Sequence, residues 1–167
     1  KPSIWNVYQE ESYKLNRRIK GVTQISFVLH QKIHLKGFSF APLQKAYEKL
    51  YASENDAVYG DTFRIEGREV TGIGNNVTLE FHDMDFGEDG CSSVTICGRT
   101  HNDKDAIHIS FQEGEQETRQ LVEFEGTADD SYRELTFPLK CVKGTKTVRF
   151  IFLPGSNFDF SWVEFHH

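Results

Sequence analysis

The clearest pattern in this chain is the alternation of apolar and polar residues near its C-terminus. Residues 147–153 and 159–165 alternate with a period close to two, and a Pro-Gly-Ser-Asn sequence separates them. A period of two is typical of β-strands with one buried face. The pattern therefore predicts two strands joined by a tight corner. Because the last strand is rich in aromatic residues, it needs neighbouring strands to bury them, so we expect it to lie within a sheet.

Strand-like patterns recur at short intervals along most of the chain. The further expected strands are 24–29, 33–40, 63–66, 69–71, 77–81, 93–99, 106–112, 118–125 and 132–139. One segment has helical spacing instead: it begins after Pro42, has apolar residues at i, i+3, i+4 and i+7 from Leu43, and ends near Tyr51. Many strands with a single helix predict an all-β fold, a two-sheet β-sandwich with one short helix.

The ends of the chain differ from this pattern. Residues 1–21 mix aromatic and charged residues without a sustained period, so we expect an N-terminal arm that packs on the domain. Residues 22–165 are expected to form the sandwich, and no internal repeat is evident. The chain begins at Lys1 and ends in His166 and His167, which we interpret as a tag remnant on a module excised from a longer polypeptide.

Composition restricts the classes of partner. The chain has 14 Phe and one Met, which suits strands packed through aromatic rings. Its formal net charge is −6, and the densest basic cluster, at residues 14–20, follows Glu10 and Glu11. No basic stripe is available to neutralise phosphates, so we expect no nucleic-acid partner. The apolar runs are far shorter than the roughly 20 residues of a membrane-spanning helix, so we expect no membrane association.

Motifs of known catalytic chemistry are missing from the sequence. It has no Gly-x-Ser-x-Gly, no glycine loop that opens a helix, no His-Glu-x-x-His, and three cysteines without metal-site spacing. The acidic loop Asp83–Gly90 offers many oxygen donors for Ca²⁺, but it lacks the twelve-residue pattern of a helical calcium loop. The sequence therefore favours a binding or structural module over an enzyme and leaves calcium open at this loop.

Four segments resemble family 6-type carbohydrate-binding modules. They are residues 38–40, 54–61, 72–81 and 152–162, which read FSF, ENDAVYGD, GIGNNVTLEF and FLPGSNFDFSW. More narrowly, they look like the C-terminal modules appended to bacterial family 2 glycoside hydrolases of the β-galactosidase type, and the similarity covers about residues 22–165. The resemblance implies a jelly-roll, galactose-binding-like β-sandwich without a catalytic role. It also implies a sugar site in loops at one edge and catalytic domains in the same polypeptide.

The resemblance suggests which residues would bind the sugar. The family's aromatic residue after the first polar loop matches Tyr59, and its asparagine before the last strand matches Asn157 or Asp159. A ring can stack on the apolar face of a sugar, while amides and carboxylates bind its hydroxyls. The family's second aromatic wall, a tryptophan, is replaced by Asp129 and Asp130. The resemblance thus implies a shallow, polar site with Tyr59, Asp129 and Asn157 or Asp159 as ligand-binding residues.

The structural calcium of this family is expected to be missing. Its ligands are acidic residues in the first strand and an aspartate before the terminal tryptophan. If residues 33–40 are the first strand, His34 and Lys36 occupy the acidic positions, and Ser161 replaces the aspartate. Losing carboxylates and gaining a cation both disfavour a divalent ion, so we expect no cofactor and no metal at this position.

The function expected from these observations is a non-catalytic module that holds a parent glycoside hydrolase near a galactose- or xylose-type glycan. A shallow site implies weak binding, because little surface is buried against the cost of association. The alternative is a structural or interaction domain of a β-galactosidase-like parent that binds no sugar, which the missing aromatic wall favours. A hydrolase in its own right would need two carboxylates facing each other across a concave site. The compartment, secreted or cytoplasmic in a bacterium, stays open.

Overall fold

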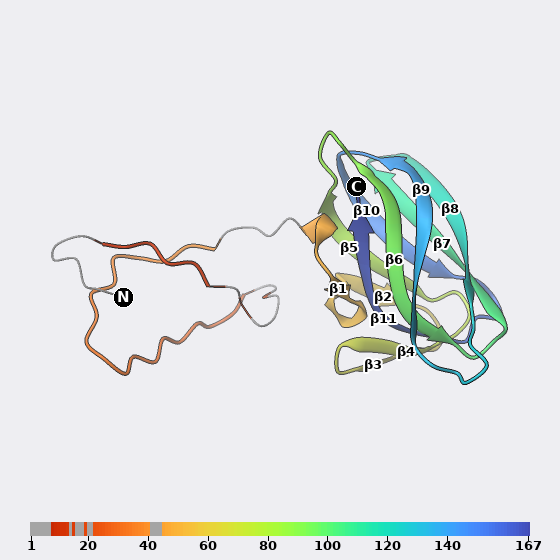
Figure 1. Cartoon of the computed structure of the whole chain (residues 1–167), viewed down its shortest axis with the longest axis horizontal. Coiled ribbons are helices and arrows are strands. Elements are labelled where there is room, and N and C mark those ends of the chain that lie inside the picture. Colours follow the sequence, from red (N-terminus) through yellow and green to blue (C-terminus); the bar gives the residue numbers. More distant parts are fainter. Residues whose placement is uncertain (1–7, 14, 16–18, 20–21, 41–44) are drawn as a thin grey trace. The chain divides into compact units, whose positions relative to one another are not determined.

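The computed structural model divides into two units by its internal contacts, Lys1–Ala41 and Pro42–His167, and each is described separately (Figure 1). It describes residues 8–13, 15, 19, 22–40 and 45–167. In the first unit, the described residues contain no helix and no strand, so the strands expected at 24–29 and 33–40 are wrong. The expected packing of the N-terminal arm 1–21 falls mostly outside the described residues and stays a prediction.

The second unit is a two-sheet β-sandwich, which confirms the predicted fold class. Its elements in chain order are η1 (Lys45–Tyr47), β1 (Leu50–Tyr51), η2 (Ala52–Glu54), β2 (Ala57–Tyr59), β3 (Arg64–Glu66), β4 (Glu69–Ile73), β5 (Thr78–Asp85), β6 (Cys91–Thr100), β7 (Lys104–Glu113), β8 (Gln116–Glu125), β9 (Arg133–Val142), β10 (Thr145–Phe152) and β11 (Phe158–His166). The described helical structure consists of two short 3₁₀ turns, η1 and η2. The longer helix expected up to Tyr51 does not form over residues 45–51, because Leu50 and Tyr51 pair with β11. No helix among the described residues is long and apolar enough to cross a membrane.

The strands divide between two antiparallel sheets (Figure 1). Sheet A has the order β3-β4-β11-β6-β9, with β1 also paired to β11, and sheet B has the order β2-β5-β10-β7-β8. The strands β10 and β11 are consecutive in the chain but lie in different sheets, so the corner between them carries the chain from one sheet to the other. Both are paired on two sides, β10 by β5 and β7 and β11 by β4 and β6. The terminal aromatic strand therefore lies within a sheet, as predicted.

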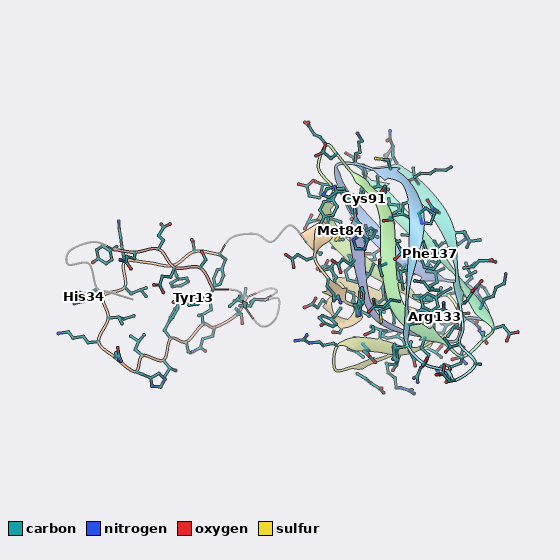
Figure 2. All side chains as sticks on the ribbon, viewed as in Figure 1. Tyr13, His34, Met84, Cys91, Arg133 and Phe137 are labelled. Carbon is teal, nitrogen blue, oxygen red and sulfur yellow. The ribbon has the colours of Figure 1, made fainter. Side chains whose placement is uncertain are left out.

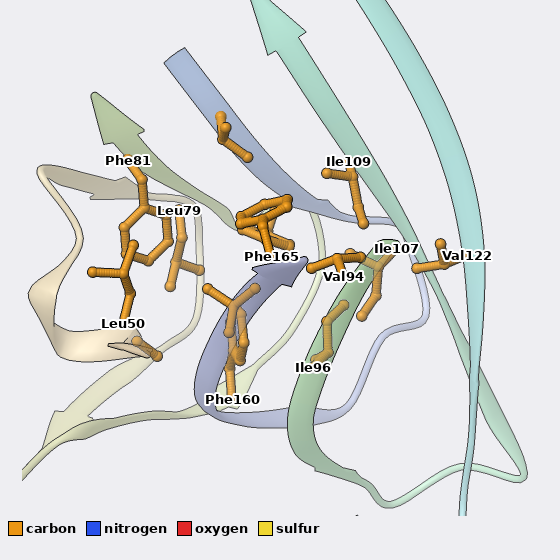
Figure 3. Close-up of a cluster of buried hydrophobic side chains, with 14 of the residues drawn as sticks. Leu50, Leu79, Phe81, Val94, Ile96, Ile107, Ile109, Val122, Phe160 and Phe165 are labelled. Carbon is orange, nitrogen blue, oxygen red and sulfur yellow. The ribbon is translucent and has the colours of Figure 1, made fainter. Parts of the chain in front are cut away.

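Aromatic rings fill the space between the sheets. Figure 3 shows Leu79 and Phe81 of β5 and Phe160 and Phe165 of β11 in one buried cluster with aliphatic residues of β6, β7 and β8. The rings of Phe150 and Phe160 come from opposite sheets, and their centroids lie 5.2 Å apart. Burial of each such side chain contributes roughly 1.5–3 kcal/mol, so these contacts account for much of the stability of the sandwich.

The last two residues contact the sandwich. His166 is the final residue of β11, where it pairs with Ser93, and its Nε2 lies 2.8 Å from the Thr95 hydroxyl. The ring of His167 stacks on Tyr47 with centroids 4.1 Å apart. The sandwich therefore extends one residue beyond the boundary expected at residue 165, and the interpretation of these histidines as a tag remnant stays a prediction.

Candidate functional site

Tyr59 lies at the end of β2, an edge strand of sheet B, and is 48% exposed. The register places Ala57 opposite Glu80 and Tyr59 opposite Thr78. Successive side chains of a strand point to opposite faces of the sheet. Since Leu79 and Phe81 of β5 are buried in the core, Glu80 between them points to the outer face, where the Tyr59 hydroxyl donates a hydrogen bond to its carboxylate.

Glu80 is the centre of a charged network on this outer face. Besides the Tyr59 hydroxyl, it accepts hydrogen bonds from His82 Nε2, at 3.0 Å, and from Arg149 Nε. Burial alone would raise the pKa of Glu80, but the hydrogen bonds from its three partners and the positive charge of Arg149 lower it to about 2. The carboxylate is therefore ionised near neutral pH and fully engaged, and it holds the Tyr59 ring in place by its hydroxyl.

The surface around Tyr59 crosses the full width of sheet B. The registers between neighbouring strands place outward-facing residues opposite one another, so that they form rows across all five strands. We call this surface the Tyr59 face and define it by Tyr59, Thr78, Glu80, His82, His108, Ser110, Gln112, Leu121, Arg149 and Ile151. Leu121, on the opposite edge strand, is 49% exposed. Four steps between neighbouring strands separate the two exposed side chains, a width of roughly 19 Å, which suits a ligand larger than one sugar ring.

The second group of predicted residues lies elsewhere, in the loops at one end of the sandwich. Asp159 is 4% exposed, and it accepts hydrogen bonds from the Gly72 backbone at 2.8 Å and from Arg99 Nε at 3.1 Å. Burial alone would raise the pKa of Asp159, but the hydrogen bonds and charge of Arg99, with the Gly72 amide, lower it below its usual value. Asp159 thus joins β11 to β4 and β6 and has no free oxygen to offer a ligand.

His101 connects the remaining predicted residues of this end. Its Nδ1 lies 2.8 Å from Asp130, its Nε2 lies 3.3 Å from Asp159, and its backbone N–H donates to the carbonyl of Asn157 at 2.9 Å. Asp129, next to Asp130, is exposed and accepts a hydrogen bond from the Ser131 hydroxyl. The structure therefore brings Asp129, Asn157 and Asp159 to one end of the sandwich. Sequence reasoning missed His101, because a single histidine in a polar turn carries no motif.

A hollow of about 250 Å³ opens beside these loops. It is lined by Asn102, Lys104, Asp105, Ala106, Glu123, Leu153, Pro154, Gly155 and Ser156. Its lining includes amide, ammonium and carboxylate groups but no aromatic ring on which a sugar could stack. Tyr59 is not part of it, and Tyr59 and Asp129 belong to opposite margins of sheet B, since β2 is one edge and Asp129 follows the other edge strand, β8. The single site expected from the sequence is thus divided: Tyr59 lies on the Tyr59 face, whereas Asp129, Asn157 and Asp159 lie in the end loops. None of these three residues lines the hollow, which we call the edge hollow.

The first strand of the sandwich is β1, and this corrects the reasoning about calcium. His34 and Lys36 lie in the first unit, where the described residues form no strand. The cation beside the terminal tryptophan is Lys49, whose Nζ lies 3.7 Å from the centroid of Trp162, and the Ser161 hydroxyl donates to Glu69 at 3.1 Å. Within the described ranges, no three His, Cys, Asp or Glu side chains are grouped to hold a metal ion. The lack of calcium stays a prediction.

Comparison with known proteins identifies the fold. No protein-family model and no curated protein matches the chain. Solved structures do match, among them CsCBM6-3 from Clostridium stercorarium in complex with cellobiose, with 24% identity and a TM-score of 0.63 over 72% of this chain and 94% of that one. A family 6 carbohydrate-binding module from Clostridium cellulolyticum in complex with xylose has 21% identity and a TM-score of 0.63, with 73% and 98% covered.

A larger enzyme also contains this fold. A glycoside hydrolase family 43 arabinoxylan arabinofuranohydrolase from Bacillus subtilis, in complex with cellotetraose, has 18% identity and a TM-score of 0.59. The match covers 73% of this chain but 27% of the enzyme. At such identities the likeness establishes the fold: residues of the second unit form a β-sandwich of the kind found in family 6 carbohydrate-binding modules.

Proposed function

We propose that this protein is a non-catalytic carbohydrate-binding module and that the Tyr59 face is its sugar-binding surface. The observation that carries the proposal is the half-exposed ring of Tyr59, fixed by its hydroxyl to Glu80 beside Arg149 and Gln112. A fixed ring offers an apolar platform at a low entropic cost, and the neighbouring charged groups can bind hydroxyls of the ligand. Solved structures with this fold bind cellobiose and xylose, which supports a glycan as the ligand class.

The ligand we propose is an oligosaccharide of the galactose or xylose type, and the module would hold a parent glycoside hydrolase of the β-galactosidase kind near it. The width of the Tyr59 face suits several sugar units, and the appended fold in the arabinofuranohydrolase supports a hydrolase as the parent. Binding is expected to be weak, because an open face buries little of each sugar.

The two carboxylates Glu80 and Asp159 do not have the properties of a catalytic pair. A glycosidase needs one carboxyl group that is protonated as an acid and a second that acts as a nucleophile or base. Glu80 has its pKa lowered to about 2 and has three hydrogen-bonding partners, so it does not supply a proton near neutral pH. Asp159 is buried and is bound to Arg99 and to the Gly72 amide. Both carboxylates therefore act as anchors in this proposal.

Calorimetric titration with xylo-, galacto- and gluco-oligosaccharides tests the proposal. We expect Tyr59→Ala to abolish or strongly weaken binding, and Tyr59→Phe to keep most of it, because the phenylalanine ring retains the stacking surface. Ile65→Ala is a matched control, since Ile65 is 54% exposed on sheet A and lies outside the Tyr59 face. No heat or affinity for any glycan of the panel, with a folded wild-type protein, would contradict the proposal.

A second variant separates the two candidate surfaces. Lys104 lines the edge hollow, and its ion pair with Glu123 at 2.7 Å is exposed, so its removal changes stability little. Under our proposal, Lys104→Ala binds the glycan like the wild type. Loss of binding in Lys104→Ala with unchanged binding in Tyr59→Ala would place the site at the hollow.

The alternative function is a structural or interaction domain. Residues 22–40 favour it for the first unit, because they expose apolar side chains to solvent. In this alternative the sandwich is a structural domain of a β-galactosidase-like parent and binds no sugar, so no glycan of the panel would give a signal.

A further inference from the structure

Residues 22–40 expose apolar side chains at the spacing of β-strands but form no strand. Phe27, Leu29 and Leu35 are 54%, 57% and 57% exposed, and Phe38 and Phe40 are 59% and 56% exposed. Figure 2 shows no strand arrow along this segment, on which His34 is labelled. A segment with this much exposed apolar surface is unusual for a stable monomeric surface and indicates a missing partner.

The spacing of these side chains repeats that of β10 and β11. In the sandwich, the inward residues are Val148, Phe150 and Phe152 of β10, followed by Phe158, Phe160, Val163 and Phe165 of β11. In the first unit, the corresponding apolar residues are Ile25, Phe27 and Leu29, followed by Ile33, Leu35, Phe38 and Phe40. Both series have intervals of two, two, then a linker, then two, three and two residues.

The three-residue interval makes this agreement specific. In β11 it comes from an irregularity of register between Phe160 and Trp162, which shifts the inward face by one residue. The first unit has the same interval between Leu35 and Phe38, with Gly37 inside it. A plain alternating strand would have an interval of two at this point. This repeat is not evident from residue identities, and it becomes visible once the register of β11 is known.

A strand pair with this pattern needs a complete sandwich around it. In the second unit, β10 lies between β5 and β7, β11 lies between β4 and β6, and the inward residues are at most 2% exposed. In this sandwich β10 and β11 already occupy the two places, so residues 25–40 cannot take them. Residues 1–23 are too few to supply the missing strands, because the corresponding strands of the second unit, β1 to β9, occupy residues 50–142.

We propose that residues 25–40 are the closing strand pair of a second β-sandwich with this topology, whose other strands are supplied by a preceding module of the same polypeptide. Residues 25–29 occupy the place of β10 in one sheet, and residues 33–40 occupy the place of β11 in the other. The polar residues between the apolar ones, such as His34 and Ser39, then lie on the outer faces. This assignment does not depend on sugar binding by the Tyr59 face.

Hydrogen–deuterium exchange followed by mass spectrometry tests the assignment. The measurement compares the 167-residue chain with a longer polypeptide that includes the proposed preceding module. We expect amides of 25–29 and 33–40 to exchange rapidly in the 167-residue chain and at least about a thousandfold more slowly in the longer one, because they become paired inside two sheets. Slow exchange in both proteins, or fast exchange in both, would overturn the proposal.

Two neighbouring substitutions in the longer polypeptide provide a matched comparison. Leu35→Asp places a charge at an inward position and is expected to remove the protection of 25–40. Lys36→Asp places the same charge at the position that matches Ser161, which has an intermediate exposure on the outer face, and is expected to leave the protection unchanged. Equal effects of the two substitutions would contradict the assigned register, and neither should change the exchange of β5 to β11.

Discussion

Replacing Glu80 with glutamine tests the charge network that fixes Tyr59. Glu80 is 7% exposed and accepts hydrogen bonds from Tyr59, His82 and Arg149. The pKa of a glutamate in an unfolded chain is about 4.3. Against this value, the pKa of about 2 in the folded protein corresponds to a stabilisation of about 3 kcal/mol at neutral pH, at about 1.36 kcal/mol per pKa unit.

The direction of the pH dependence follows from the sign of this shift. Because the folded-state pKa is lowered, the stabilisation is complete above about pH 4.5 and is lost as the pH falls toward 2. We therefore expect Glu80→Gln to lower the free energy of unfolding by about 3 kcal/mol at pH 7, or the Tm by roughly 10 °C for a domain of this size. The difference from the wild type should shrink between pH 4.5 and 2.

Urea and thermal denaturation followed by circular dichroism, at pH 7, 5, 3.5 and 2.5, measure this difference. Glu115→Gln is a suitable control, because Glu115 is exposed in the turn between β7 and β8, and a surface substitution of this kind changes stability by less than about 0.5 kcal/mol. A Glu80→Gln protein as stable as the wild type at pH 7 would refute the reasoning. So would a difference that stays constant down to pH 2.5.

Two further substitutions test the anchors of the sandwich. Asp159→Asn removes the negative charge beside Arg99 and is expected to cost about 2–3 kcal/mol in unfolding experiments. Asp129→Asn, in an exposed loop, should leave the stability nearly unchanged. Gly98→Ala would place a methyl group 2.3 Å from the buried ring of Phe158 and is expected to cost about 2–3 kcal/mol by overpacking, measured by thermal unfolding. Equal stabilities of the two aspartate variants, or wild-type stability of Gly98→Ala, would contradict the packing described for β6 and β11.

Much of the sandwich follows from the sequence, because most of its strands have one buried face. The alternation of residues 77–81, 93–99 and 106–112 predicts β5, β6 and β7, and the structure confirms them as longer strands. The strands β1 and β2 have two and three residues, too few to show a period. An alternation with a period of two also does not indicate the sheet to which a strand belongs. The placement of β10 and β11 in different sheets therefore had to come from the structure.

The sequence pattern also predicts strands where none forms. This is the case for residues 24–29 and 33–40, which have the alternation of strands. A period of two indicates which face a strand would bury, and it contains no information on whether partner strands are present. Because strand hydrogen bonds join distant segments, the same pattern can remain unpaired in one part of a chain and be paired in another. This is the physical reason why the boundary of the sandwich moved from residue 22 to the region of Leu50.

For the candidate site, the sequence pointed to the aromatic residue but not to the residues that surround it. Tyr59 was identified by resemblance, but Glu80 and Arg149 reach it from other strands through the register of sheet B. At the other group of loops, His101, a residue without a motif, connects Asn157, Asp159 and Asp130, the neighbour of Asp129. Pairwise registers decide which side chains share a face, and these depend on contacts between segments far apart in the chain.

The most direct test of the central claim is to map a bound glycan on the surface. Chemical-shift changes in the ¹⁵N-labelled protein during titration with a xylo- or galacto-oligosaccharide would locate it residue by residue. If the sugar covers half of the exposed surface of Tyr59, about 50 Å², the ring contributes roughly 1.2 kcal/mol, or about eightfold in affinity. We predict changes centred on Tyr59, Thr78 and Arg149, with an affinity at least about eightfold lower in Tyr59→Ala. Changes confined to residues 102–106 and 153–156, or none with any glycan, would contradict the account.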